Sequence, residues 1–305
     1  MAGMTEGYGT GFLVVTNAAA GSHDHERAGA ALAVLRAHAD VRHEECRDPA
    51  DWDRLLETRD GRTVVVVGGD GSLHTAVSAA WRRGELGQML FGLVPLGTGN
   101  DFARTVGIPL DDPAEAAHAV LSSRPKSLDL LVDDAGGVVV NVVHAGVGAQ
   151  AAARATPLKP TLGKAAYAVG GVVAGATSTG WHLAVTVDGA AVAADAPVLL
   201  AAVANGSTIG GGSEVAPDAV PDDGLLDVVV ATSTGPLARL GFGVAMRDGE
   251  HVERDDVIWV RGRTATIAGE AYPLNADGEL EEDVRARTWT VHPSAWRLLS
   301  PRTRR

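Results

Sequence analysis

Two glycine-rich loops, each placed directly after an apolar run, constrain this chain more than any other feature. The first loop, residues 68–72, reads GGDGS and follows the run TVVVV at residues 63–67. The second, residues 97–101, reads GTGND and follows the run LFGLVPL at residues 90–96. A β-branched run without polar alternation predicts a strand buried on both faces, as in a parallel sheet. Glycines directly after such a strand allow a sharp turn and a close approach of the backbone to a ligand.

Each loop also carries an aspartate, and the first loop leads into residues with helical spacing, Leu73, Ala76 and Val77. The order strand, glycine loop, helix start is a recurring geometry for holding phosphate on backbone N–H groups. A carboxylate beside a bound phosphate is repelled unless a cation lies between them, so Asp70 and Asp101 predict a nucleotide site that also holds Mg²⁺. The alternative is that the glycines serve the geometry of a strand-to-helix turn alone. No G-x-x-x-x-G-K-[ST] motif occurs in the chain.

The remaining periodicity predicts two domains of different class. Up to about residue 127, strands alternate with helices, which indicates an α/β domain with a parallel sheet and helices on both faces. The strands are expected over 12–16, 41–46, 63–67 and 90–94, and the helices over 22–38, 51–58, 73–83 and from 113. From 128 to 293, short apolar or alternating runs separated by Asp-Gly and Gly-rich turns predict a β-rich sandwich.

Charge and cysteine content exclude some classes of partner and compartment. The formal net charge is −12, which argues against nucleic acid as a partner because phosphate backbones demand a basic face. The single cysteine, Cys46, fits a reducing compartment, and no signal peptide is visible, so a cytoplasmic protein is expected. Between Asp134 and Asp188 there is no acidic residue. That window predicts either a buried strand–helix pair or a wall that receives lipid, on which Arg154, Lys159 and Lys164 would lie.

The motifs in this order resemble those of the bacterial diacylglycerol kinase family, lipid kinases related to sphingosine and ceramide kinases. The resemblance is carried by NAAAG at 17–21, GGDGS at 68–72, PLGTGNDFAR at 95–104, DGLLDV at 223–228 and NADGE at 275–279. It implies a first domain similar to those of NAD kinase and phosphofructokinase, to which residues 294–305 return. It also implies ATP and Mg²⁺ as cofactors, with the nucleotide in the cleft between the two domains.

The resemblance assigns roles to particular residues of this sequence. Phosphoryl transfer requires positioning and charge neutralisation around the phosphates, for which Asp70 and Asp101 are the candidates. The acceptor base is implied to be Asp277, with Glu279 orienting the acceptor or sharing the task; an Asp-Gly hairpin turn is the alternative interpretation. A separate structural Mg²⁺ site is implied at the Asp223 carboxylate, with the carbonyls of Val220 and Leu225. The expected nucleotide-binding residues are Asn17, Ala18, Ala19, Ala20, Gly21, Gly68, Gly69, Asp70, Gly71, Ser72, Gly97, Thr98, Gly99 and Asn100.

Several functions remain open at this point. The favoured one is transfer of the ATP γ-phosphoryl group to a lipid primary hydroxyl, with diacylglycerol giving phosphatidic acid. The alternatives are a kinase of sphingoid bases or other lipids, an NAD kinase, and a non-catalytic lipid- or nucleotide-binding regulator. NAD kinases share the GGDG loop but usually carry an Asn-Glu pair, whereas Asn205 here precedes Gly206. The expected partner is a lipid substrate reached by peripheral contact with a membrane surface, and the resemblance makes a homodimer plausible.

Overall fold

A computed structural model describes residues 11–18, 21–146, 149, 180–232, 235–247 and 249–301. The chain divides into two compact units, Met1–Asp129 with Ser294–Arg305, and Leu130–Pro293. The expected boundaries lay near residue 127 and at residue 294. Across the described ranges, no helix combines the length and apolarity that crossing a membrane requires. The expected lipid-receiving wall with Arg154, Lys159 and Lys164 lies outside the described residues.

The first unit is built on a parallel sheet in the order β2–β1–β3–β4–β16. Its last neighbour comes from the far end of the chain, since Arg297–Leu299 of β16 pairs with Leu90–Gly92 of β4. The elements are β1 (Phe12–Asn17), α1 (Ser22–His38), β2 (Val41–Cys46), α2 (Asp51–Glu57), β3 (Thr63–Gly68), α3 (Asp70–Arg82), η1 (Leu86–Gln88), β4 (Leu90–Pro95), α4 (Asp101–Thr105) and α5 (Pro113–Ser122). Strands β5 (Arg124–Asp133) and β16 (Glu279–Ser300) each run across the division between the units.

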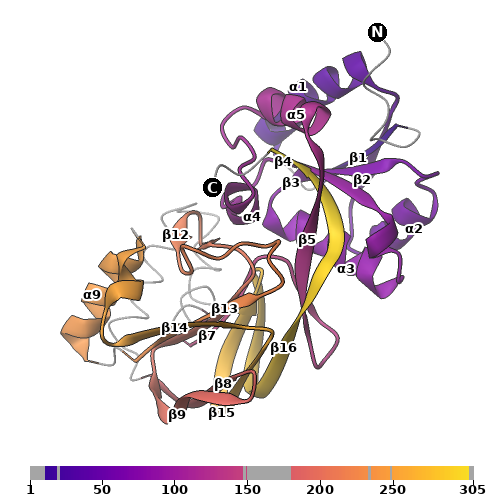
Figure 1. The fold of residues 1–305 in the computed structure, drawn as a ribbon. Helices are drawn as coiled ribbons and strands as arrows, with labels where there is room; N and C mark the ends of the chain where they lie inside the picture. Colours follow the sequence, from indigo (N-terminus) through magenta and orange to yellow (C-terminus); the bar gives the residue numbers. More distant parts are fainter. Residues whose placement is uncertain are drawn as a thin grey trace. The chain divides into compact units, whose positions relative to one another are not determined.

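Helices cover both faces of this sheet because its inner strands β1, β3 and β4 are largely apolar and buried, whereas the edge strand β2 is mostly polar. Val64–Val67 of β3 are at most 2% exposed, as a strand with two covered faces requires. Helices α1 and α5 lie together on one face, and α2 and α3 lie on the other (Figure 1). The apolar face of α5 buries Ala116 and Val120, as the helical spacing predicts. The expected α/β class with a parallel sheet is confirmed for this unit.

The second unit is β-rich, which confirms the expected class. Its antiparallel ladder runs β14–β13–β10–β7–β15, and β8 pairs with both β9 and β15. Its elements are β6 (Val138–Val139), β7 (Val142–Gly146), β8 (Trp181–Val187), β9 (Ala190–Val198), β10 (Leu200–Ala204), β11 (Thr208–Ile209), β12 (Ser213–Glu214), β13 (Leu226–Ala231), α9 (Pro236–Arg247), η3 (Glu250–Glu253), β14 (Val257–Gly262) and β15 (Thr264–Ala276).

Strand β15 forms the corner of this sandwich. Its first half, Ala265–Gly269, pairs with β8, and its end, Leu274–Ala276, pairs with β7. An irregularity in its pairing with β16 lies between these two stretches, where a bulge lets the strand bend. One core therefore fills the space that β15 encloses, and a second core lies on the opposite face of β7, β10 and β13 with Phe242 of α9.

Candidate functional site

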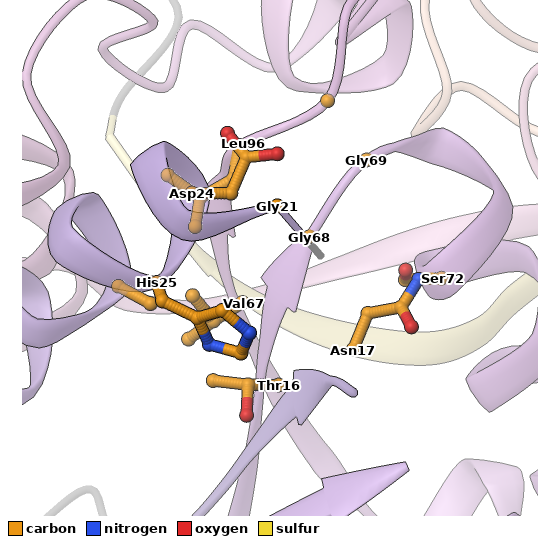
Figure 2. A pocket seen from close by; sticks show the side chains of 12 residues that line it. Thr16, Asn17, Gly21, Asp24, His25, Val67, Gly68, Gly69, Ser72 and Leu96 are labelled. Carbon is orange, nitrogen blue, oxygen red and sulfur yellow. The ribbon is translucent and has the colours of Figure 1, made fainter. Parts of the chain in front are cut away.

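A pocket opens at the carboxyl ends of three neighbouring parallel strands of the first unit, β1, β3 and β4. Ligands of open α/β sheets bind at this edge, because the loops after the strands gather there. The cavity has a volume of about 240 Å³. Figure 2 shows residues from β1, α1, β3 and α3 arranged around it. The lining residues are Thr16, Asn17, Gly21, Asp24, His25, Ala28, Val67, Gly68, Gly69, Ser72, Leu96 and Gly97.

Glycines form much of this wall because the two loops touch each other through their backbones. A Cβ atom added to Gly97 would lie 2.5 Å from the Cα of Gly69, and one added to Gly69 would lie 2.9 Å from the Cα of Gly97. At Gly68 an added Cβ would lie 2.6 Å from the Oγ of Ser72. Packing between the loops therefore requires Gly69 and Gly97, whereas Gly68 packs against Ser72 of its own loop. Gly71 differs, since nothing lies within 4 Å of the position its Cβ would take.

Two helices begin at the pocket, and glycine precedes each of them. Gly21 is the N-cap of α1 and Gly69 is the N-cap of α3. A glycine N-cap supplies no side-chain acceptor for the N–H groups of the first helical turn. Those N–H groups and the positive end of the helix dipole favour an anion. The chemistry of this edge is therefore suited to phosphate.

The Asp70 carboxylate joins the first loop to the second. Its Oδ2 accepts the N–H of Asp101 and its Oδ1 accepts that of Phe102, both at 3.0 Å. Asp70 is thus the first residue of α3 and also holds the start of the short helix α4. Asn100, in the left-handed conformation at φ 53°, completes the second loop by donating from Nδ2 to the carbonyl of Gly97 at 2.8 Å.

The residues expected to act on the acceptor lie in the second unit, at the turn between β15 and β16. The Asp277 carboxylate accepts three backbone N–H groups, from Val140 at 2.6 Å and from Asn141 and Val142 at 3.0 Å. Asp277 therefore fixes the start of β7, whatever else it does. Glu279 is exposed. On β7, burial lowers the pKa of His144 to about 4, with the Asp277 charge opposing the shift, so this imidazole is neutral near pH 7.

The expected structural metal position also lies in the second unit. The Oδ1 of Asp223 accepts the N–H of Leu225 at 3.0 Å, and its Oδ2 accepts a hydrogen bond from Nη2 of Arg261. Within the described residues, no group of three or more His, Cys, Asp and Glu side chains is arranged to hold a metal ion. Asp223 is therefore paired with the guanidinium of Arg261.

Comparisons with known proteins agree over both units. Residues 11–132 match the diacylglycerol kinase catalytic domain, and residues 141–300 match the YegS C-terminal NAD kinase beta sandwich-like domain. A Pseudomonas aeruginosa (strain UCBPP-PA14) protein named "Probable lipid kinase YegS-like" is 35% identical over 248 residues, 78% of this chain and 76% of that protein. The chain belongs to the diacylglycerol kinase family of lipid kinases.

Two further proteins that carry the name diacylglycerol kinase are similar to this chain, one in sequence and one in fold. A Mycobacterium tuberculosis (strain H37Rv) protein named "Diacylglycerol kinase" is 29% identical over 244 residues, 78% of this chain and 77% of that protein. A solved structure from Bacillus anthracis str. Sterne, named "a putative diacylglycerol kinase", has a TM-score of 0.77 at 22% identity. It covers 96% of this chain and 98% of its own, which shows the shared fold.

Within this diacylglycerol kinase family member, the pocket includes part of the expected nucleotide-binding set. The expected residues that line it are Asn17, Gly21, Gly68, Gly69, Ser72 and Gly97. Ala18, Asp70, Gly71, Thr98, Gly99 and Asn100 are not among the lining residues, and Ala19 and Ala20 lie outside the described residues. Asp70 and Asn100 instead build the loops, through the hydrogen bonds described above.

Sequence reasoning missed several residues of the pocket wall. Asp24 and His25 come from the first turn of α1, and Thr16 from the end of β1. The signal was available, because a helix that begins after an expected nucleotide loop must direct its first turn toward the same space. Thr16 is held by a 2.9 Å hydrogen bond between its Oγ1 and Nε2 of His43. Burial, followed by the charge of Arg36, lowers the pKa of His43.

Proposed function

We propose that this chain is an ATP- and Mg²⁺-dependent lipid kinase that transfers the γ-phosphoryl group to a primary hydroxyl, with diacylglycerol as the acceptor and phosphatidic acid as the product. The observation that carries the proposal is the pocket at the carboxyl ends of β1, β3 and β4, walled by glycine backbone. Membership of a lipid kinase family supports the acceptor class.

In this proposal the phosphates of ATP bind against the first turns of α1 and α3. Gly21 and Gly69 leave the N–H groups there without a capping side chain, and the hydroxyl of Ser72 adds a donor at the wall. Phosphoryl transfer needs little from a protein beyond such positioning and the stabilisation of charge. The loop–loop contact between Gly69 and Gly97 makes this cradle rigid, which suits that task.

The proposal places Mg²⁺ at Asp70 and Asp101. Each carboxylate oxygen of Asp70 accepts one backbone N–H group at the start of α4, which holds this carboxylate beside the second glycine loop and close to Asp101. These oxygen donors fit the preference of Mg²⁺. The ion would supply charge neutralisation to the phosphate oxygens.

For the acceptor hydroxyl, the proposal names Asp277 and Glu279 as the candidate bases. The Asp277 carboxylate already accepts three backbone N–H groups, so it is engaged in holding the start of β7. Glu279 is exposed. This difference favours Glu279 as the group that takes the proton and Asp277 as the residue that positions the turn.

The partners belong to the proposal as well: a lipid acceptor at a membrane surface, and a second copy of the chain. Co-sedimentation with vesicles tests the first, with retention in the supernatant as the contradicting result. Light scattering on the purified protein tests the second, with a monomer mass as the contradicting result.

The decisive experiment is a transfer assay with labelled ATP, Mg²⁺ and separate acceptors: diacylglycerol, a sphingoid base, ceramide and NAD⁺. We expect label on diacylglycerol. Label on NAD⁺ alone, or nucleotide binding without transfer to any acceptor, would reject the proposal in favour of an NAD kinase or a regulator. Asp70→Asn should reduce transfer at saturating lipid, whereas Asp111→Asn, which changes an exposed carboxylate of the same unit, should not.

A further inference from the structure

Arg261 of β14 lies against two carboxylates of the second unit. In the antiparallel register of β13 and β14 it stands directly opposite Asp227. Its Nε lies 3.2 Å from Oδ1 of Asp227, and its Nη2 donates to Oδ2 of Asp223. The Arg261 guanidinium therefore forms ion pairs with Asp227 on β13 and with Asp223 in the loop that precedes β13.

Asp227 needs a positive charge because it is buried. Its side chain is 1% exposed, and its Oδ1 also accepts a hydrogen bond from Nε1 of Trp259 at 2.8 Å. Burial raises the pKa of Asp227, while the Trp259 hydrogen bond and the Arg261 charge oppose that rise. Removing one partner of a buried ion pair is strongly destabilising, because the other charge is left uncompensated.

A positively charged group already lies at the Asp223 carboxylate. Its Oδ1 accepts the N–H of Leu225, and its Oδ2 faces the guanidinium of Arg261. A Mg²⁺ ion at Oδ2 would lie beside a permanent positive charge, and it would have to displace a charge-assisted hydrogen bond. The donor set around Asp223 thus does not fit the structural Mg²⁺ site that the family resemblance implies there.

We propose that Arg261 supplies, in this chain, the positive charge that the resemblance assigns to a structural Mg²⁺ ion at Asp223. The loop that precedes β13 is then fixed to β14 by an internal ion pair. As a consequence, the folding stability of the second unit does not depend on divalent metal. This inference is independent of the proposed kinase activity, since it concerns folding alone.

Thermal unfolding without nucleotide tests the proposal, with EDTA or millimolar MgCl₂ added to the parent chain, Asp223→Ala and Arg261→Gln. The parent should unfold at the same temperature in both solutions. Arg261→Gln should unfold on the order of 5 °C lower in EDTA. Added MgCl₂ should restore part of that loss, because Asp223 and Asp227 then present carboxylate oxygens without a cation. Arg285→Gln, at an exposed position of β16, is the matched control and should show neither effect.

Two further variants keep the test decisive. The double variant Asp223→Ala/Arg261→Gln should lose the rescue by MgCl₂, and Arg261→Lys should remain independent of metal. The proposal is overturned if MgCl₂ stabilises the parent and Asp223→Ala abolishes that gain, or if Arg261→Gln leaves the unfolding temperature unchanged. If Arg261→Gln does not fold, the parent and Asp223→Ala are compared for the change in unfolding temperature that MgCl₂ causes. No change in the parent supports the guanidinium as the source of the positive charge, and a gain in the parent that Asp223→Ala abolishes supports the metal.

Discussion

At the scale of single residues, glycines that look alike in the sequence have different reasons for being there. Gly69 and Gly97 are required by each other, because each occupies the space where the other's side chain would lie. Gly71 has open space around its missing Cβ and is exposed. At Gly71, and at Gly21 in the pocket wall, the surrounding protein gives no reason for the absence of a side chain.

Gly97→Ala and Gly71→Ala separate these two reasons. Gly97→Ala forces the loops apart, so we expect a loss of about 1–3 kcal/mol in the free energy of unfolding and weaker nucleotide binding. Gly71→Ala should leave stability within about 0.5 kcal/mol of the parent. Chemical denaturation and calorimetric titration with ATP measure the two quantities. Unchanged stability in Gly97→Ala would show that the loops do not need this contact.

Asp277 and Glu279 can be distinguished in the same way. Asp277→Asn replaces an acceptor oxygen with an NH₂ group that faces backbone N–H donors, so it should cost about 1–3 kcal/mol of stability as well as activity. Glu279→Gln, at an exposed position, should retain the parent's stability and lose turnover on the order of 10²-fold. Full turnover in Glu279→Gln would show that Glu279 is not the base, and Asp277 would then be the candidate.

At the scale of elements, most strands and helices of the first unit could be predicted because each carries a complete local signal. The apolar run of β3 and the Asp-Pro start of α5 are examples. Helix α4 could not be predicted, since its start depends on the Asp70 carboxylate, which is distant in the sequence. Strands β14, β15 and β16 were not predicted, because mixed polar and apolar residues become strands there only through their neighbours. For the same reason, the ion pair of Arg261 is invisible without the register of β13 and β14.

Strand β7 carries a pH dependence in His144. Its pKa is lowered from 6.5 to about 4, so the unfolded chain binds more protons between those values. Above about pH 6.5 this histidine is neutral in both states and does not reduce the free energy of unfolding. As the pH falls from 6.5 toward 4, the unfolded chain takes up the proton first, and the free energy of unfolding decreases. His144→Gln should flatten the curve of unfolding free energy against pH in that window, whereas His118→Gln, at an exposed site, should not. Parallel curves for the parent and His144→Gln would contradict this expectation.

At the scale of the whole molecule, the first unit is not continuous in the sequence. Trp296 of β16 is fully buried in it, stacked on Phe102 with ring centroids 5.7 Å apart and edge-on to Phe91 at 5.8 Å. Its Nε1 donates to the carbonyl of Asp129 at 3.1 Å. The last described strand is thus part of the core on which the pocket rests.

Trp296→Ala should therefore cost about 3–5 kcal/mol of stability, as expected for a buried tryptophan. It should also weaken nucleotide binding, although Trp296 does not line the pocket. Leu237→Ala is the control, because Leu237 is 85% exposed on α9. Denaturant titration and calorimetry with ATP provide the measurements. A loss of less than about 1 kcal/mol in the free energy of unfolding would show that the core of the first unit packs without this residue.

The pairing of β4 with Arg297–Leu299 has a consequence for how the protein is made. A ribosome delivers residues in order, so β4 emerges long before its partner and waits as an open sheet edge. Unpaired strand edges in nascent chains invite association with other chains. During that interval the first unit lacks a strand and a tryptophan of its core, so its core cannot be completed before the residues up to Ser300 have been synthesised. Ribosomes stalled earlier should hold a chain that proteases cut readily and that chaperones retain.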